Sequence, residues 1–415
     1  MKGWNNTRLK NLLNEPLLYG LNVSSEYEER DMPRYIRITD FDDFNNLNEQ
    51  TFKSLPEEIA QSAQLKDGDL LFARSGASVG KTFLYRPLPN GACYAGYLIR
   101  ARFDRQRVMP EYVSYYTKSQ SYENWKNATY IQATIQNISA ERYYQLPISI
   151  PPLEEQGRIV SYLNDKTGKI DARVSLLSKK RDAYQRLKKA LISRVVTKGL
   201  NPNAKFKPSG VDWIGEIPEG WEVKRIKEIC DFVSRGTTPD YVDESKYKVM
   251  NQATFSKGYI DDSIVRYTCK PSADANIKMG DLLIASTGGG VLGKVLYYNR
   301  EDKFFYADSH VSILRNSKGE NCMKFLYYVF STKFAEINAT MVKGSTNQTE
   351  LQRNYLLAHE IPIPAKAEQQ SIASYLDEKC SEIDANIANL EKQIEKYKEL
   401  KRALISEVVT GKRRV

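Results

Sequence analysis

Cysteine and histidine, the residues that most often hold zinc or form disulfide frameworks, are scarce in this sequence. The chain has five cysteines and two histidines in 415 residues. The cysteines are odd in number and form no CxxC pair, which argues against both a disulfide framework and a zinc site. They fit a reduced cytoplasm, and they are Cys93, Cys230, Cys269, Cys322 and Cys380.

Long apolar runs are also missing. No stretch approaches the roughly eighteen apolar residues that a membrane span requires. The first residues, MKGWNNTRLKNLL, lack the apolar region of a signal peptide. We therefore expect a soluble, cytoplasmic protein.

What the sequence has in excess is positive charge. Sixty-one lysines and arginines oppose 51 aspartates and glutamates, which gives a formal net charge of +10. This balance favours a polyanionic partner, although many proteins that never bind DNA are equally basic. The length exceeds that of a usual single domain and predicts two globular domains.

An internal repeat organises the chain. Residues 148–197 align without a gap with residues 361–410, and 25 of the 50 positions are identical. The shared pattern runs from I-x-I-P through Glu-Gln, Tyr-Leu and Ile-Asp-Ala to A-L-I-S-x-V-V-T. Such self-similarity indicates a duplicated architecture.

Each copy of the repeat predicts a long helix with a coiled-coil seam. Apolar residues recur in steps of four and three, with Arg181 in the first copy at the position of an isoleucine in the second. About thirty residues of helix, roughly 45 Å long, would pair antiparallel with the other copy. The alternative is that these helices line a globular core. The predicted seam residues are Ile170, Val174, Leu177, Tyr184, Ile383, Ile387, Leu390, Ile394 and Tyr397.

The regions before each repeat also resemble each other. Lys66–Ala73 recurs as Lys278–Ala285, a glycine turn that leads into an apolar strand, and Tyr94-Ala95 recurs as Tyr306-Ala307. Short apolar runs between turns predict α+β domains: two similar mixed domains separated by two long helices that form an antiparallel, pseudo-two-fold coiled coil. The predicted divisions are residues 1–147, 148–198, 199–360, which includes a linker rich in proline, lysine and glycine, and 361–415.

Together these motifs resemble the specificity subunit of type I restriction-modification systems. The signals are I-P-P-L-E-E-Q at 150–156, I-P-x-x-x-E-Q at 363–369, the A-L-I-S-x-V-V-T helix ends, and G-V-D-W-I-G-E-I-P-E-G-W at 210–221. They cover essentially the whole chain in the expected order. Arg181 and the Ala-Lys-Ala at 365–367 depart slightly from the pattern.

The resemblance implies a non-catalytic, sequence-specific DNA-binding subunit. Each recognition domain would read one half of a bipartite double-stranded target, while the helices set the spacing. Two modification (methyltransferase) subunits, which carry S-adenosylmethionine, would dock on this chain. Restriction subunits, the ATP-dependent translocase and nuclease, would join the complex. No cofactor and no metal are expected on the chain itself.

Glycine-rich segments after the apolar strands, and polar stretches before each repeat, are the candidate DNA contacts. Backbone N–H groups and lysines suit phosphates, arginine suits guanine, and amides suit adenine. Tight turns, solvated arginines and ordinary polar loops explain the same residues. The candidates are Arg74, Ser75, Lys81, Gln132, Thr134, Gln136 and Asn137 in the first half, and Thr287, Lys294, Lys343, Ser345, Asn347 and Gln348 in the second.

Two other functions compete with DNA reading. Gly288-x-x-x-x-Gly293-Lys294 has the spacing of a nucleotide-binding P-loop, but Val295 stands where the Mg²⁺-binding Ser or Thr belongs, and Gly76–Thr82 is one residue short. An ATP-driven enzyme is therefore disfavoured. A coiled-coil scaffold whose end domains bind proteins is the remaining alternative.

Overall fold

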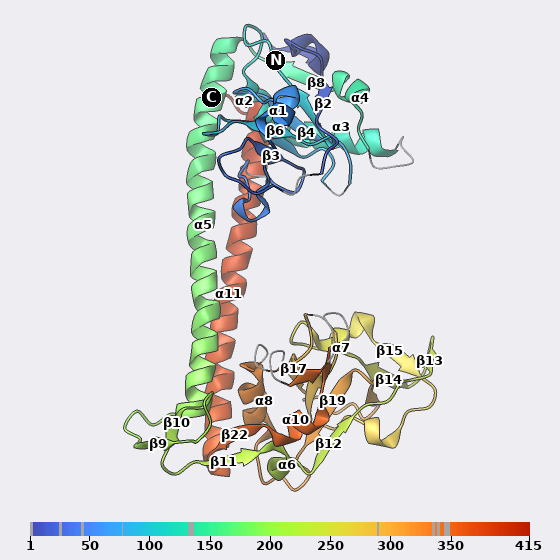
Figure 1. Ribbon diagram of the computed structural model, residues 1–415, viewed down its shortest axis with the longest axis vertical. Helices are drawn as coiled ribbons and strands as arrows, with labels where there is room; N and C mark the ends of the chain where they lie inside the picture. Colours follow the sequence, from blue (N-terminus) through green and yellow to red (C-terminus); the bar gives the residue numbers. More distant parts are fainter. Residues whose placement is uncertain are drawn as a thin grey trace. The chain divides into compact units, whose positions relative to one another are not determined.

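The chain forms two compact units, one that combines two separate segments of the sequence and one that is a single continuous segment. The computed structural model describes residues 3–24, 27–42, 45–76, 78–131, 137–288, 290–333, 337, 341–343 and 349–415. Unit 1 comprises Met1–Ser178 and Glu391–Val415, and unit 2 comprises Lys179–Leu390 (Figure 1).

Unit 1 is built on an antiparallel sheet with the strand order β2-β7-β4-β5. The apolar run Leu70–Ala73 forms the inner strand β4 and is entirely buried, as expected for a strand covered on both faces. Strands β1 and β8 pair antiparallel, and β3 and β6 pair parallel. The bounds are β1 Asn5–Arg8, β2 Leu18–Tyr19, β3 Arg34–Ile36, α1 Glu57–Ala60, β4 Leu70–Ala73, β5 Thr82–Leu84, β6 Ala92–Tyr94, β7 Leu98–Ala101, α2 Pro110–Tyr116, α3 Gln120–Ile131, α4 Ala140–Tyr144 and β8 Pro147–Ile150.

Unit 2 repeats this topology with strands in the order β12-β19-β16-β17 and a β11–β22 pair. Its second sheet, β13-β15-β14-β18, keeps the parallel pair of unit 1 and adds two strands. The bounds are β9 Phe206–Pro208, β10 Glu216–Pro218, β11 Glu222–Arg225, α6 Ile226–Ile229, β12 Phe232–Arg235, β13 Tyr241–Val242, β14 Tyr247–Met250, α7 Gln252–Phe255, β15 Arg266–Thr268, β16 Leu282–Ala285, β17 Val295–Tyr297, β18 Phe305–Ala307, β19 Val311–Arg315, α8 Met323–Ser331, β20 Val342–Lys343, β21 Glu350–Leu351, α10 Arg353–Ala358 and β22 Glu360–Ile363. The predicted α+β class with related halves is confirmed.

One predicted correspondence is wrong by a single residue. In the parallel strand pairs, Ile36 lies opposite Tyr94 in unit 1, and Met250 lies opposite Ala307 in unit 2. Tyr94 therefore matches Ala307 rather than Tyr306. The second unit has one extra residue in its glycine-rich loop, and this shifts the numbering of everything that follows.

The repeated segments form helices longer than the predicted thirty residues. Helix α5 spans Leu153–Lys198 and has 46 residues, and α11 spans Lys366–Val409 and has 44. The extra length arises because the ends of each helix are buried in a domain core. Ile159 and Leu163 of α5 join the core of unit 1, whereas Ile192 and Val196 join that of unit 2.

Within each unit the two helices pack antiparallel. In unit 1, Lys401 of α11 pairs with Asp171 of α5 at 2.7 Å. In unit 2, Lys188 of α5 pairs with Asp384 of α11 at 2.6 Å. These are equivalent positions of the repeat, so the aspartate of the Ile-Asp-Ala motif makes the same inter-helix ion pair twice.

The predicted seam residues face inward along these helices. Buried or half-buried positions alternate with exposed ones, which is the narrow stripe that a single partner helix requires. Arg181 makes its ion pair with the adjacent Asp182 at 2.7 Å. Ile170, Leu177, Ile383, Leu390 and Ile394 are buried, and Val174, Tyr184, Ile387 and Tyr397 are half-buried. At the helix ends the competing interpretation also holds, since there the helices do line globular cores.

Candidate nucleic-acid interface

The repeated Lys-x-Gly-Asp turn fixes the start of the inner strand in each unit. The Asp69 carboxylate accepts a hydrogen bond from the Lys66 backbone N–H at 2.8 Å and binds the Arg102 guanidinium through both oxygens, at 2.8 and 2.7 Å. Asp281 and Arg315 form the same pair at 2.6 and 2.7 Å. Both carboxylates are almost fully buried. This pair therefore holds the strand that carries the candidate residues.

The glycine-rich segments are hairpin loops rather than phosphate loops. In the first loop the Ala73 carbonyl accepts from the Gly80 N–H and the Ala73 N–H donates to the Lys81 carbonyl, both at 2.8 Å. Ala285 makes the same two bonds with Gly293 and Lys294. The next residues begin strands β5 and β17. A P-loop leads into a helix whose N-terminus faces the phosphates, so the fold removes the basis for an ATP-driven enzyme.

The two candidate lysines beside these loops contact their own units. The Lys294 Nζ donates to the Ser256 carbonyl oxygen at 2.7 Å. The Lys81 Nζ lies 5.4 Å from the centre of the Phe41 ring. Both side chains are half-buried, which favours a structural role for each.

The polar stretch before each repeat returns to the end of the inner strand. Ser75 pairs with Asn137 in unit 1, and Thr287 pairs with Glu350 in unit 2, each through an isolated antiparallel bridge. The structure thus brings these four residues into two equivalent places. Gln132, Thr134, Gln136, Ser345, Asn347 and Gln348 lie outside the described residues, and of Lys343 only the backbone, in β20, is described.

In both units the same four positions surround the end of the inner strand. They are set by matching backbone hydrogen bonds, since the N–H of Arg74 binds the carbonyl of Tyr97 and that of Ser286 binds the carbonyl of His310. We call this set the strand-end site. It consists of Tyr19, Arg74, Tyr97 and Asn137 in unit 1, and Arg235, Ser286, His310 and Glu350 in unit 2.

In unit 1 the strand-end site is organised around Arg74. Its guanidinium carbon lies 4.7 Å from the centre of the Tyr19 ring, and its Nε lies 3.5 Å from the Asn137 side-chain oxygen. The Tyr19 hydroxyl accepts a hydrogen bond from the Ala140 backbone N–H at 3.0 Å. Tyr97 is 62% exposed beside it.

In unit 2 the same site has different side chains and different charges. Arg235 forms an ion pair with Glu350, and its Nε donates to the Ser309 carbonyl. The Thr287 hydroxyl donates to the Gln252 side-chain oxygen at 3.1 Å and hydrogen-bonds the His310 Nδ1 at 2.7 Å. This half of the chain therefore presents amide, hydroxyl and imidazole groups.

The buried Asp308 holds the histidine loop of unit 2. Its carboxylate accepts a hydrogen bond from the His310 backbone N–H at 2.8 Å. Burial raises the pKa of Asp308 above its usual value, while the hydrogen bond from His310 and nearby Arg235 act in the opposite direction.

Sequence reasoning missed Tyr19, Arg235, Gln252 and His310. Tyr19 and Arg235 are the last residues of strands that are too short to show a sequence pattern. A usable signal was the glycine that follows each of them. A Cβ on Gly20 would lie 2.3 Å from the Tyr94 carbonyl oxygen, and one on Gly236 would lie 2.2 Å from that of Ala307, so only glycine permits this close approach.

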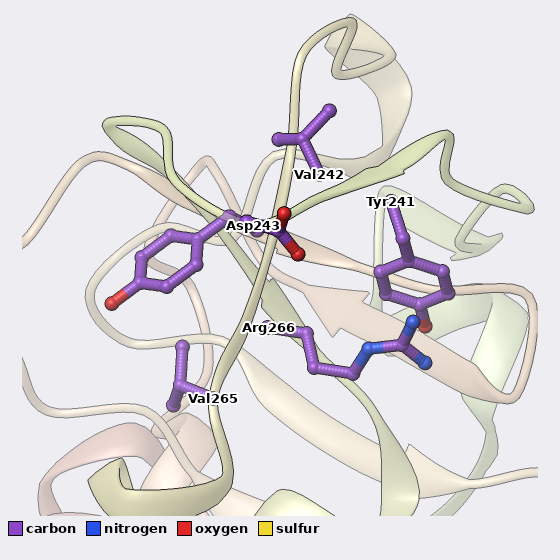
Figure 2. A pocket seen from close by; sticks show the side chains of 6 residues that line it. Tyr241, Val242, Asp243, Val265 and Arg266 are labelled. Atoms are coloured by element: carbon purple, nitrogen blue, oxygen red, sulfur yellow. The ribbon is translucent and has the colours of Figure 1, made fainter.

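Unit 2 also carries an open hollow of about 290 Å³ between β13 and β15. Figure 2 shows Tyr241 and Arg266 side by side in it, and the guanidinium carbon of Arg266 lies 3.3 Å from the centre of the tyrosine ring. Within the described residues, the matching sheet of unit 1 has only β3 and β6.

Other functional centres receive no support from the described part of the chain. No group of three or more His, Cys, Asp or Glu side chains gathers there in a way that would hold a metal ion. Among the same residues, no helix combines the length and apolar character needed to span a bilayer.

Comparison with known proteins connects this geometry to one family. The family model described as type I restriction modification DNA specificity domain matches residues 1–174 and 218–396. The MjaVIII specificity subunit of Methanocaldococcus jannaschii, a type I restriction enzyme subunit, is 24% identical over 362 residues, which cover 85% of this chain and 80% of the relative. The putative MjaX specificity subunit of the same organism is 26% identical over 379 residues, or 86% of this chain and 81% of the relative.

Solved structures share the fold. A chain from a type I R-M system, solved to explain its complex assembly and conformational transition, has a TM-score of 0.74 at 19% identity, and the match covers 99% of this chain and 98% of that one. The HsdS subunit from Thermoanaerobacter tengcongensis has a TM-score of 0.50 at 20% identity, with 99% and 97% covered.

Proposed function

Since the chain belongs to the type I restriction modification DNA specificity domain family, we propose that each of its units reads one half of a bipartite DNA target. The chain is a specificity subunit of a type I restriction-modification system. In this proposal the helices α5 and α11 set the spacing of the two half-sites.

One observation carries the proposal. The same frame, held by the same buried Asp–Arg pair, presents different side chains at the strand-end site of each unit. A duplicated frame with divergent contact residues suits the reading of two unlike sequences. The net charge of +10 suits a DNA partner.

Specificity subunits of this family work with modification and restriction subunits. We infer that two modification subunits dock on this chain, supply S-adenosylmethionine and carry out methylation, and that restriction subunits carry out cleavage. Two equivalent exposed leucines support a partner present in two copies. Leu187 on α5 is 53% exposed, and its repeat counterpart Leu400 on α11 is 54% exposed. The chain itself contributes recognition and no catalytic group.

The first test measures DNA binding by the chain assembled with its modification subunits. We expect sequence-selective duplex binding whose affinity falls steeply with salt concentration, because phosphate contacts release counterions. Competition with a scrambled duplex of equal length is the control. Equal affinity for target and scrambled duplexes would refute the proposal.

A second test exchanges residues 1–150 for the same segment of a relative, so that the paired strands β1 and β8 move together. Methylation sequencing of the host should then show one altered half-site and one unaltered half-site. An unchanged motif, or a change in both halves, contradicts independent reading by the two units.

A further inference from the structure

The arginine of the strand-end site has a different position and different contacts in the two units. In unit 1 the Arg74 guanidinium rests on the Tyr19 ring, and its Nε lies 3.5 Å from the Asn137 side-chain oxygen. In unit 2 the arginine stands at the tyrosine position instead, as Arg235, and is held by the carboxylate of Glu350.

Contacts on several sides fix the orientation of Arg74. Its backbone N–H donates to Tyr97 at 3.0 Å, and its carbonyl accepts from Ile138 at 2.9 Å. The side chain is half-buried between Tyr19 and Asn137. An arginine held this way loses less entropy when it binds than a free surface arginine does.

A planar guanidinium with free N–H donors matches one base edge in particular. Arginine donates two parallel hydrogen bonds to O6 and N7 of guanine in the major groove, and stacking on an aromatic ring leaves that planar fork available. The hydrogen bond with Ser139 is the largest cause that lowers the pKa of the Glu141 carboxylate, and the positive charge of Arg74 lowers it further.

We propose that Arg74 reads a guanine in the half-site of unit 1, with Tyr19 as its positioning residue. This inference rests on the proposed function. The equivalent position in unit 2 is Ser286, which is buried and hydrogen-bonded to the Ser312 hydroxyl at 2.6 Å. Unit 2 therefore has no arginine at this position, and the proposed contact applies to the half-site of unit 1.

The test uses the complex with modification subunits and a set of duplexes in which each base pair of the target is changed singly, at one salt concentration. For Arg74→Ala we expect the preference for guanine at one position of one half-site to fall roughly 10- to 100-fold. Preferences at every other position should stay unchanged. Arg74→Lys keeps the charge but not the two parallel donors, so it should lose the same preference while retaining affinity for non-target DNA.

Variants of the positioning residue and a matched arginine complete the design. Tyr19→Leu removes the ring and should weaken the same single preference, whereas Tyr19→Phe keeps the ring and should preserve most of it. Arg105→Ala, which removes an exposed arginine paired with Asp67 at 2.9 Å, should alter no base preference.

A phosphate contact would give a different result and would overturn the inference. In that case Arg74→Ala would weaken binding to all duplexes alike and lower the dependence on salt by about one phosphate contact. Arg74→Lys would then behave almost like the unchanged protein. If the unchanged complex shows no base preference at any position, the proposed function itself fails.

Discussion

At the scale of single residues, the glutamine of the repeated Glu-Gln motif ties each long helix to its own unit. Gln156 is 1% exposed. Its side-chain oxygen accepts from the Met109 N–H at 2.8 Å, and its amide nitrogen donates to the Pro151 carbonyl at 2.9 Å. Gln369 makes the equivalent bonds with Cys322 and Pro364. The motif is therefore a helix-to-domain joint.

Replacing this glutamine should destabilise unit 1. Gln156→Ala leaves the partly buried Met109 N–H and the buried Pro151 carbonyl without their side-chain partner, and an unpaired buried group costs about 1–3 kcal/mol. We expect the free energy of unfolding in urea to fall by at least that amount. Gln106→Ala, at an exposed position, is the control and should change it by less than about 0.5 kcal/mol. Equal behaviour of the two variants would mean that the joint contributes nothing.

Lowering the pH should reduce the free energy of unfolding of unit 1, partly because Glu15 becomes protonated. Hydrogen bonds from Arg102, and to a smaller extent the charges of Arg102 and Arg100, lower the pKa of Glu15 below 4.5. A carboxylate with a lowered pKa stabilises the fold above its unfolded pKa, and this stability is lost as the pH falls through the folded pKa. Glu15→Gln should cost about 1 kcal/mol at pH 7, because the site is partly exposed, and should cost less below pH 4.5.

The pH dependence of unfolding, followed by circular dichroism between pH 3 and pH 7, measures this effect. Glu58→Gln, at an exposed position, should leave the pH profile unchanged. A constant difference between Glu15→Gln and the unchanged protein at every pH would contradict the assigned pKa.

The residues in and next to the strand-end site could be predicted from the sequence only in part. Arg74, Ser75, Asn137 and Thr287 follow or face an apolar strand with a clear motif, and the structure gathers them. Tyr19 and Arg235 end two edge strands that carry no periodic signal, and pairing across the sheet brings them to the site. Tertiary contact of this kind has no local signature.

At the scale of elements, the sequence predicted two helices and their antiparallel contact but not their full length. The motif A-L-I-S-x-V-V-T is the same in both copies, so the sequence does not tell which core receives it. The structure places Leu404, Ile405 and Val408 of α11 in the core of unit 1. The Tyr112 hydroxyl donates to the carbonyl of Val409 at 3.1 Å. The last helix therefore completes the first unit.

Leu187 and Leu400, the equivalent exposed leucines of the two long helices, are the positions at which we expect the modification subunits to dock. Leu187→Glu and Leu400→Glu should each leave the stability of the chain within about 0.5 kcal/mol, because both side chains are more than half exposed. Each change should remove one modification subunit from the complex, since a charge in a buried apolar contact costs about 2 kcal/mol or more. The double variant should bind none.

Mass measurement of the assembled complex counts the bound subunits. Leu176→Glu is the matched control, because Leu176 is 56% exposed on α5 but has Asn389 as its repeat counterpart. Loss of both modification subunits from each single variant, or of none from the double variant, would exclude these leucines as the docking positions.

At the scale of the whole molecule, the duplicated sequence folds into two units that share both long helices. The first part of α5 and the last part of α11 belong to unit 1, and their remaining parts belong to unit 2. Unit 1 therefore combines two separate stretches of chain, whereas unit 2 is one continuous stretch. This exchange follows from antiparallel pairing of two copies of one helix, and it makes the helices part of both recognition units.

Lengthening both helices tests whether they set the spacing of the DNA target. Seven residues inserted into α5 after Ser178 and seven into α11 before Glu391 keep the seam in phase, because the seam repeats every seven residues. They add about 10.5 Å of helix, or roughly 3 base pairs at 3.4 Å each. Methylation sequencing should therefore find the same two half-sites separated by a gap about 3 base pairs longer. Four-residue insertions shift the seam out of phase and should impair assembly instead. An unaltered gap with the seven-residue insertions would mean that another part of the complex determines the spacing.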